Sequence, residues 1–263
     1  MTRNVLTVPL RRVEAGQVSE IQDFVAVEEP LEIVVNGRSV SITMRTPGHD
    51  SELAAGFLFT EGLLIGPHQI ASIGQTINSV QIVLHPDVEI DLDRLARHFY
   101  MSSSCGVCGK ASIEALRTGP CPTIPRDSPQ VDAAVISRLP ALLRAEQAVF
   151  ERTGGLHAAA LFDAQGSLLT LREDVGRHNA VDKIAGSEML AGRAPCSDRI
   201  LLVSGRASFE LMQKSLMAGI PILAAVGAPS SLAVEIAQRF GLTLLGFVRD
   251  GRFNIYSGAG RIQ

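Results

Sequence analysis

The feature that most constrains the fold of this chain is an alternation of short apolar segments with amphipathic helical segments after Gly154-Gly155. Segments with the length and composition of buried strands are His157–Phe162, Ile200–Val203, Ile222–Val226 and Thr243–Val248. Segments with helical spacing are Asn179–Leu190, Phe209–Met217 and Ser231–Phe240. Strands that are apolar on both sides and joined through helices form a parallel sheet covered on both faces. The second half is therefore predicted to be an α/β unit.

Segments at both ends of this region extend the predicted unit. A helical stretch from Asp132 to Glu151 is expected to be interrupted at Pro140, because proline lacks the N–H that a helix interior needs. Leu168–Leu171 follows a turn and is the expected hairpin partner of the first strand. A turn at Asp250-Gly251 leads into a last strand at Phe253–Tyr256.

The first half has a different pattern. Two strands are expected on either side of Asn36-Gly37, because both residues of a tight hairpin turn must tolerate positive φ. Asp50 or Ser51 is expected to cap a helix over Glu52–Phe59. The remaining expected elements are a strand over Val80–Leu84, helices over Asp91–Tyr100 and Ala111–Arg117, and an irregular segment over residues 1–20. This pattern predicts a small α+β roll.

A Pro-rich stretch over residues 119–130 separates the two patterns and contains Pro120, Pro122, Pro125 and Pro129. Such a stretch is typical of a linker. We therefore predict an N-terminal α+β domain over residues 1–130 and a C-terminal α/β domain over residues 131–263.

The composition argues against nucleic-acid and membrane partners. The chain has 263 residues, is 46% apolar and has a net charge of −3, so no overall positive field attracts nucleic acid. Its start lacks a signal-like apolar stretch, and no apolar run is long enough to span a bilayer. A cytoplasmic location is expected. In that reducing compartment the 4 cysteines are expected to be reactive, metal-bound or inert rather than disulfide-linked.

The strongest chemical motif is Cys105-Gly-Val-Cys108 between a serine run and Gly109-Lys110. A helix start and Lys110 both favour the thiolate form, which is the nucleophile and the metal ligand. A flexible thiol pair that passes a group between partners is one interpretation. A zinc site is the other, and it needs further ligands from Cys121, Cys196 or a histidine.

Polar residues at two strand-to-helix junctions predict an anion site. Ser204, Arg206 and Ser208 open one helix, and Ser230 opens the next. Helix starts with hydroxyl and guanidinium groups suit phosphate, although serine is also a common helix cap. Parallel sheets bind ligands at the carboxyl ends of their strands, so two adjacent junctions favour a nucleotide-like ligand.

Three further segments are candidates for ligand contact. The dense polar and charged residues of Arg172–Asn179, which lead into Asp182-Lys183 at a helix start, suit an anionic or polycyclic ligand, or a salt-bridged helix start. His157 lies in a segment similar to the zinc deaminases, but Ala159 replaces their catalytic glutamate, so deaminase chemistry is not expected. Arg249 and Arg252 flank an Asp-Gly turn and suit phosphate or an exposed hairpin.

Together these segments resemble the formate dehydrogenase accessory sulfurtransferase family, the FdhD-type sulfur carriers. The stretches that carry the resemblance are Cys105–Gly109, Thr153–Ala160, Glu173–His178, Val203–Ser215 and Gly246–Tyr256. The resemblance implies a C-terminal three-layer α/β/α domain similar to the cytidine deaminase-like fold. It also implies a homodimer.

The resemblance further implies a sulfurtransferase that works through a cysteine persulfide on Cys105, with Cys108 assisting. A cysteine desulfurase would donate the sulfur, and the cargo would be the molybdenum cofactor, bis-molybdopterin guanine dinucleotide, destined for the catalytic subunit of formate dehydrogenase. No resident metal is expected, and a guanine nucleotide is a possible surrogate ligand. The implied cofactor-binding residues are Phe247, Val248, Arg249, Asp250, Gly251 and Arg252, with Arg177, His178, Ser204, Arg206, Ser208 and Ser230 as further candidates.

Two alternatives remain beside this interpretation. In one, the chain is a zinc-stabilised nucleotide-binding or chaperone module without sulfur transfer. In the other, it is a nucleotide-dependent enzyme whose cysteines are incidental.

Overall fold

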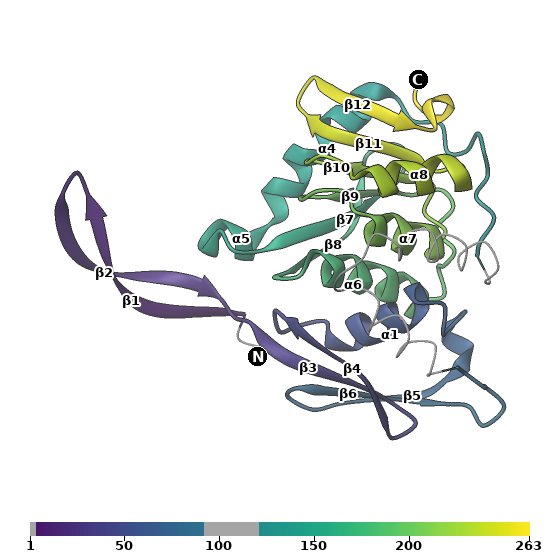
Figure 1. The fold of residues 1–263 in the computed structure, drawn as a ribbon, viewed down its shortest axis with the longest axis horizontal. Coiled ribbons are helices and arrows are strands. Elements are labelled where there is room, and N and C mark those ends of the chain that lie inside the picture. Colours follow the sequence, from purple (N-terminus) through teal and green to yellow (C-terminus); the bar gives the residue numbers. More distant parts are fainter. Residues whose placement is uncertain (1–3, 92–120) are drawn as a thin grey trace.

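The structure is a computed structural model that describes residues 4–91 and 121–263 (Figure 1). These residues form a two-stranded, a six-stranded and a four-stranded sheet with helices packed on the two larger ones. The chain is thus of mixed α/β class. No helix within the described ranges is long and apolar enough to cross a membrane. The predicted helices over Asp91–Tyr100, apart from Asp91, and Ala111–Arg117 lie outside the described residues, as do Cys105 and Cys108.

The six-stranded sheet occupies the second half of the chain. Its strands are β7 (His157–Phe162), β8 (Leu168–Asp174), β9 (Ile200–Val203), β10 (Ile222–Ala225), β11 (Thr243–Arg249) and β12 (Arg252–Ser257), in the order β12-β11-β10-β9-β7-β8. Only β9, β10 and β11 are mutually parallel. The prediction of a parallel sheet is therefore right for the centre, whereas the tight turns β7–β8 and β11–β12 impose antiparallel pairing at the edges.

Helices cover this sheet on both faces, as predicted. Helices α6 (Arg177–Leu190), α7 (Phe209–Met217) and α8 (Ser231–Phe240) share one apolar core with the sheet, and α4 (Ala133–Glu146) shares another. Successive residues of β9 alternate between them, with Ile200 and Leu202 facing α4 and Leu201 and Val203 facing the other helices. This alternation explains why the strand is apolar throughout.

The predicted interruption at Pro140 is wrong. Pro140 lies inside α4, and the chain breaks later, at Gln147, before α5 (Ala148–Thr153). Ile136, Leu139 and Leu143 are buried on both sides of the proline, and their packing on the sheet outweighs the loss of one helical hydrogen bond.

The first half contains the four-stranded sheet, in the order β4-β3-β6-β5. Its strands are β3 (Glu29–Val35), β4 (Arg38–Arg45), β5 (Ile70–Gln75) and β6 (Ser79–Leu84), and a short 3-10 turn (Pro67–Gln69) precedes β5. The predicted β3–β4 hairpin is confirmed, with φ of 47° at Asn36 and 79° at Gly37. Strand β5 was not predicted from the sequence. It is an edge strand that is mostly exposed, so it lacks a continuous apolar pattern.

Helix α1 (Asp50–Thr60) joins the two halves, lying between the four-stranded sheet and α6 (Figure 1). The backbones of α1 and α6 come so close that a Cβ added to Gly56 would lie 1.8 Å from the carbonyl oxygen of Asp182. A Cβ on Gly186 would lie 1.9 Å from that of Glu52. One apolar core includes side chains from both halves, among them Leu53 and Val181. The division into two domains near residue 130 stays a prediction.

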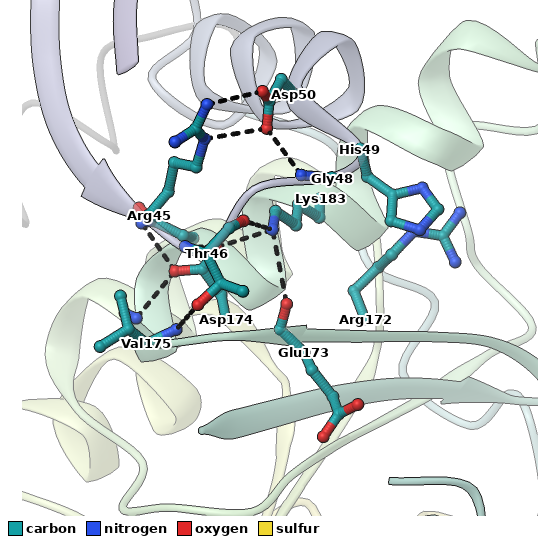
Figure 2. A network of polar contacts seen from close by, with 12 residues as sticks. Arg45, Thr46, Gly48, His49, Asp50, Arg172, Glu173, Asp174, Val175 and Lys183 are labelled. Atoms are coloured by element: carbon teal, nitrogen blue, oxygen red, sulfur yellow. Dashed lines mark hydrogen bonds and ion pairs between the residues drawn. The ribbon is translucent and has the colours of Figure 1, made fainter. Parts of the chain in front are cut away.

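The expected cap of α1 is also corrected. The N-cap is His49, with φ of 60° and no side-chain capping bond, rather than Asp50 or Ser51. The Asp50 carboxylate is instead bound by the Arg45 guanidinium, at 3.1 Å from Nε and 2.9 Å from the nearer terminal nitrogen (Figure 2). Asp50 therefore belongs to a buried ion pair and does not cap the helix.

The first residues are not irregular, as the sequence suggested, but form a hairpin. Strands β1 (Val5–Glu14) and β2 (Gln17–Ala26) pair in antiparallel register around a turn at Ala15 and Gly16, whose φ values are 49° and 81°. Figure 1 shows this ribbon projecting from the body of the molecule. Both of its faces carry polar residues, which hides the strand pattern in the sequence.

Candidate functional site

One edge of the six-stranded sheet gathers most of the described candidate residues. The parallel strands β9, β10 and β11 end at this edge, because the carboxyl ends of parallel strands coincide. Strand β7 begins there and β8 ends there, so His157 faces Asp174 across the pair. Segments that the sequence suggested separately therefore meet in space.

The two predicted strand-to-helix junctions are bonded to each other. The Ala207 N–H donates to the Ala228 carbonyl at 3.2 Å, and the Ser230 N–H donates to the Ala207 carbonyl at 2.9 Å. A Cβ at Gly227 would lie 3.0 Å from the Gly205 carbonyl oxygen, so glycine is needed for this close approach. The prediction that both junctions lie on one side of the sheet is confirmed.

Two of the candidate serines have structural partners. The Ser204 hydroxyl oxygen accepts from the Ala158 N–H at 2.9 Å. The Ser230 hydroxyl oxygen accepts from the Ala233 N–H at 3.2 Å and caps α8. Arg206 is exposed on the first junction.

Three other side chains at this edge have unsatisfied polar atoms. Among the residues that the structure describes, the buried side-chain atoms without a hydrogen-bond partner are Arg177 Nε, His178 Nε2 and Ser208 Oγ. Arg177 and His178 begin α6, and Ser208 is the N-cap of α7. His178 Nε2 lies 3.9 Å from a carboxylate oxygen of Glu210 in the first turn of α7, so the two helix starts are adjacent. Such atoms are candidate contacts for a ligand or an ordered water.

The histidines at this edge are uncharged at neutral pH. Burial, followed by the positive charges of Arg177 and Lys214, lowers the pKa of His178 to about 4. Burial and Arg177 also lower the pKa of His157. His178 therefore makes no ion pair with Glu210 at pH 7, and each imidazole can donate or accept a hydrogen bond.

A buried polar network fixes the segment that presents Arg177 and His178 (Figure 2). The Asp174 carboxylate is ion-paired with Lys183 Nζ at 2.7 Å, and both side chains are at most 1% exposed. It also accepts from the N–H groups of Thr46 at 3.2 Å and Gly176 at 2.8 Å. Lys183 Nζ donates to the Thr46 carbonyl at 2.9 Å. The β4–α1 connection thereby holds the start of α6 in place.

The charged residues of the run Arg172–His178 fall into two groups: some are bound to other residues of the chain, and others keep a polar atom without a partner. Arg172 is paired with Glu52 at 2.6 Å; burial opposes ionisation of Glu52, but Arg172 and His49 outweigh it and lower its pKa to about 2. The Glu173 carboxylate accepts from the N–H groups of Val149 and Phe150 at the start of α5. Only Arg177 and His178 of this run retain unsatisfied polar atoms toward the edge.

The C-terminal candidate segment reaches the same edge. Phe247 has φ of 54°, and its N–H donates to the Gly227 carbonyl at 3.1 Å. Val248 is fully buried in the core beneath α4, so only its backbone can face a ligand. The residues of the turn are exposed, with Arg249 and Arg252 in register across Asp250-Gly251.

The two cysteines within the described ranges are poorly suited to nucleophilic chemistry. Burial raises the pKa of Cys121. Burial followed by the negative charge of Glu188 raises the pKa of Cys196 to about 12. Both are protonated thiols at pH 7. Nor do any three His, Cys, Asp or Glu side chains of residues 4–91 and 121–263 form a group that could hold a metal ion.

Sequence reasoning missed Thr46, which completes the Asp174 network together with Asn179 from the predicted charged segment. Asn179 Nδ2 donates to Asp174 at 3.0 Å and to the Met44 carbonyl at 2.8 Å. Thr46 lies more than a hundred positions before Asp174 and carries no local signal. Only the fold brings these residues together.

The fold and this edge define an α/β protein with a candidate ligand site at the carboxyl ends of its parallel strands. The model of the FdhD/NarQ family matches residues 26–263, and the chain belongs to this family.

Curated relatives match over nearly the whole length of both chains. A protein named sulfur carrier protein FdhD from Streptomyces avermitilis is 51% identical, over 95% of this chain and 93% of its own. One of the same name from Mycobacterium tuberculosis is 47% identical over 96% of each chain. A crystal structure from Desulfotalea psychrophila, provisionally described as a formate dehydrogenase accessory protein, matches with a TM-score of 0.80 at 26% identity. It covers 99% of this chain and 100% of that one.

Proposed function

We propose that this chain is a sulfur carrier that serves formate dehydrogenase. It accepts persulfide sulfur from a cysteine desulfurase on Cys105 and passes it to the molybdenum cofactor, bis-molybdopterin guanine dinucleotide, before the cofactor enters the enzyme. The names of the relatives and the Cys105–Cys108 motif support the sulfur step. A cytoplasmic location, a homodimer and a deaminase-like C-terminal fold belong to the same proposal.

The loading step is a thiol exchange. The Cys105 thiolate attacks the terminal sulfur of the donor persulfide, the donor S–S bond breaks, and the desulfurase cysteine leaves as a thiolate. No net oxidation occurs, because one S–S bond replaces another. Cys108 assists delivery or accepts the sulfur in turn. The protonated state of Cys121 and Cys196 supports assigning this chemistry to the motif pair.

The convergence of unsatisfied donors at the sheet edge is the observation that carries the cargo assignment. Arg177 and Ser208 supply N–H and O–H donors beside two helix starts, which suit the phosphates of a dinucleotide. The turn containing Arg249 and Arg252 lies four strand positions away from β8, or about 19 Å at ordinary strand spacing. An edge of this length suits an elongated ligand with separated anionic groups.

Desulfurase loading followed by intact-mass measurement tests the sulfur step. The parent chain and Cys121→Ala, the matched control, should each gain one reductant-labile sulfur, whereas Cys105→Ala should gain none. Labile sulfur on Cys105→Ala at the parental level would refute the assignment of the acceptor.

Calorimetric titration with a guanine nucleotide tests the cargo site separately. Arg252→Ala should weaken binding by about tenfold, the order expected for loss of one charge-assisted contact. Arg11→Ala on the β1–β2 ribbon is the control and should bind like the parent. Equal affinity of Arg252→Ala and the parent would remove Arg252 from the site.

The zinc-stabilised module remains the alternative. It would need ligands beyond Cys105 and Cys108, and the buried, protonated Cys196 is ill suited to that role. Stoichiometric zinc in the purified chain, lost in Cys108→Ala, would favour it over sulfur transfer.

A further inference from the structure

Lys214 of α7 is buried where three helices meet. Its Nζ atom lies 2.9 Å from the Asp182 carboxylate in α6. It also lies 3.0 Å from Thr60 Oγ1 at the end of α1 and 3.3 Å from the carboxylate of Glu61, the C-cap of that helix. The side chains of Lys214 and Asp182 are only 6% and 3% exposed. Each of the three N–H donors of the ammonium can therefore bind an oxygen of the chain.

A buried ion pair of this kind is weak evidence for a purely stabilising role. The loss of hydration offsets much of the attraction between the two charges, and well-packed apolar side chains often replace such a pair at equal or greater stability. Neither the sulfur step nor the contacts already described at the sheet edge use Lys214. Stability alone therefore does not account for an ammonium at this position.

The buried pair lies one helical turn beneath a second pair from the same two helices. Asp182 follows His178 by four positions in α6. Lys214 follows Glu210 by four positions in α7. Residues four positions apart lie on one helix face, about 6 Å apart along the axis. We call His178 and Glu210, at the sheet edge, the outer pair, and the two residues beneath them the inner pair.

The two residues of the outer pair are close to each other but not bonded. His178 Nε2 lies 3.9 Å from a carboxylate oxygen of Glu210, which is too far for a hydrogen bond, and it has no partner among the described residues. The two side chains are 38% and 57% exposed, so a ligand can reach both. A charged His178 would be attracted to Glu210, and the resulting ion pair would withdraw both groups from a ligand.

The surroundings of His178 prevent this ion pair by keeping the imidazole uncharged. Burial is the largest cause of its low pKa of about 4, and the positive charges of Arg177 and Lys214 lower the pKa further. Glu210 acts in the opposite direction, and His157 adds a smaller lowering effect. Because the inner pair fixes Lys214, its charge is held at a constant position beneath the outer pair.

We propose that Lys214 is a positioning residue for the cargo site, which holds the starts of α6 and α7 so that His178 and Glu210 stay open to a ligand instead of binding each other. The inference rests on the proposed cargo site at this edge. The ammonium binds Asp182 in α6 and repels a proton from His178 one turn above. An uncharged imidazole and a carboxylate then remain available to the N–H groups of a nucleotide base, while the arginines of the edge bind its phosphates.

An NMR titration of the His178 ring tests the electrostatic part of this role. In Lys214→Met the pKa of His178 should rise by about one pH unit, the order expected for the loss of one nearby charge. Thr60→Val is the matched control, because it removes a hydroxyl that binds both residues of the inner pair but retains every charge. It should lower stability and leave the pKa of His178 unchanged. An unchanged pKa in Lys214→Met, or an equal rise in Thr60→Val, would overturn the proposal.

A second variant guards against misfolding of Lys214→Met. Burial already raises the pKa of Asp182, so without the ammonium this carboxyl is expected to take up a proton. Lys214→Met/Asp182→Asn reproduces that uncharged state and should show the same rise in the pKa of His178. Circular dichroism establishes that each variant is folded. A folded double variant with the parental pKa of His178 would refute the role of Lys214.

Calorimetric titration with guanosine diphosphate at pH 8 and pH 5 tests the consequence for binding. With a pKa near 5, about half of His178 in Lys214→Met is charged at pH 5, compared with about a tenth in the parent. Between the two pH values the variant should therefore lose about twofold more affinity than the parent. This extra loss should disappear when His178→Gln is added to both chains.

The outcomes separate this inference from the proposed function. A parent chain that binds no guanosine diphosphate would refute the cargo site itself, and this role of Lys214 with it. Binding whose pH dependence is the same in the parent and in Lys214→Met would refute the role of Lys214 and leave the cargo site standing.

Discussion

Gly56→Ala tests the claim that close contact between α1 and α6 holds the two halves of the chain together. Helix propensity alone predicts that this change stabilises α1 by about 1 kcal/mol, because alanine is a better helix former than glycine. The structure predicts the opposite sign. The new Cβ would lie 1.8 Å from the backbone carbonyl oxygen of Asp182, which cannot rotate away as a side chain would.

The magnitude follows from the distance that the helices must move. A close carbon–oxygen contact is about 3.3 Å, so α1 and α6 must separate by about 1.5 Å. Overpacking of a core typically costs about 1–3 kcal/mol. The same movement stretches the buried bond from Thr60 Oγ1 to Asp182, now 2.7 Å; because Asp182 keeps its ion pair with Lys214 at 2.9 Å, this loss costs only about 1 kcal/mol. After the gain in helix propensity, a net loss of about 2 kcal/mol is expected.

Urea unfolding followed by far-UV circular dichroism measures this loss. Gly74→Ala is the matched control: it adds the same methyl group in β5, where nothing lies within 4 Å, and should change stability by less than about 0.5 kcal/mol. If Gly56→Ala is as stable as the parent or more stable, the close crossing does not hold the halves together.

Three further predictions concern the buried groups. Lys183→Met leaves the Asp174 carboxylate unpaired and should cost about 3–5 kcal/mol in urea unfolding, whereas Arg11→Met breaks an exposed pair and should cost less than about 1 kcal/mol; equal losses would contradict the role of the network. The folded-state pKa of His178 is about 4 against an ordinary 6.5, so below pH 6.5 the unfolded chain binds a proton that the folded chain does not, and stability falls as the pH drops. His178→Gln should remove the pH dependence of stability that His178 causes. The parent should therefore lose more stability than the variant between pH 7 and pH 5, and equal losses would refute the lowered pKa. Cys196, with a pKa of about 12, should resist iodoacetamide at pH 7 until the chain is unfolded, and rapid native labelling mapped to Cys196 would contradict its burial.

Local signals in the sequence predicted many elements well. The bounds of α7 and α8 agree with the prediction to the residue, because each helix has a polar start and a complete apolar stripe. The β3–β4 hairpin was predicted from Asn36-Gly37, whose conformation is an intrinsic property of those residues. The errors occur where packing outweighs local preference. Pro140 remains helical because its neighbours are buried, and the β1–β2 hairpin escaped prediction because both of its faces carry polar residues.

The candidate site was also predicted only in part, because local signals indicate where helices begin but not which distant groups their side chains contact. The sequence indicated that the segments ending at Ser208 and Ser230 open neighbouring helices, and the structure places them side by side. It did not indicate that the charges of Arg172 and Glu173 are used in internal contacts while those of Arg177 and His178 face the edge. A charged side chain does not reveal its partner through local spacing when that partner lies on a distant segment.

The sequence by itself determined the α/β class, the β3–β4 turn, the order of strands and helices after Gly154, and the Cys105–Cys108 motif, because each depends on neighbouring residues. The tertiary structure alone decided that Thr46 completes the Asp174 network and that Gly56 sets the approach of α1 to α6. It also decided which polar atoms at the sheet edge remain unsatisfied. Burial and hydrogen bonding depend on groups that the chain brings together only when it folds, and no local pattern encodes them.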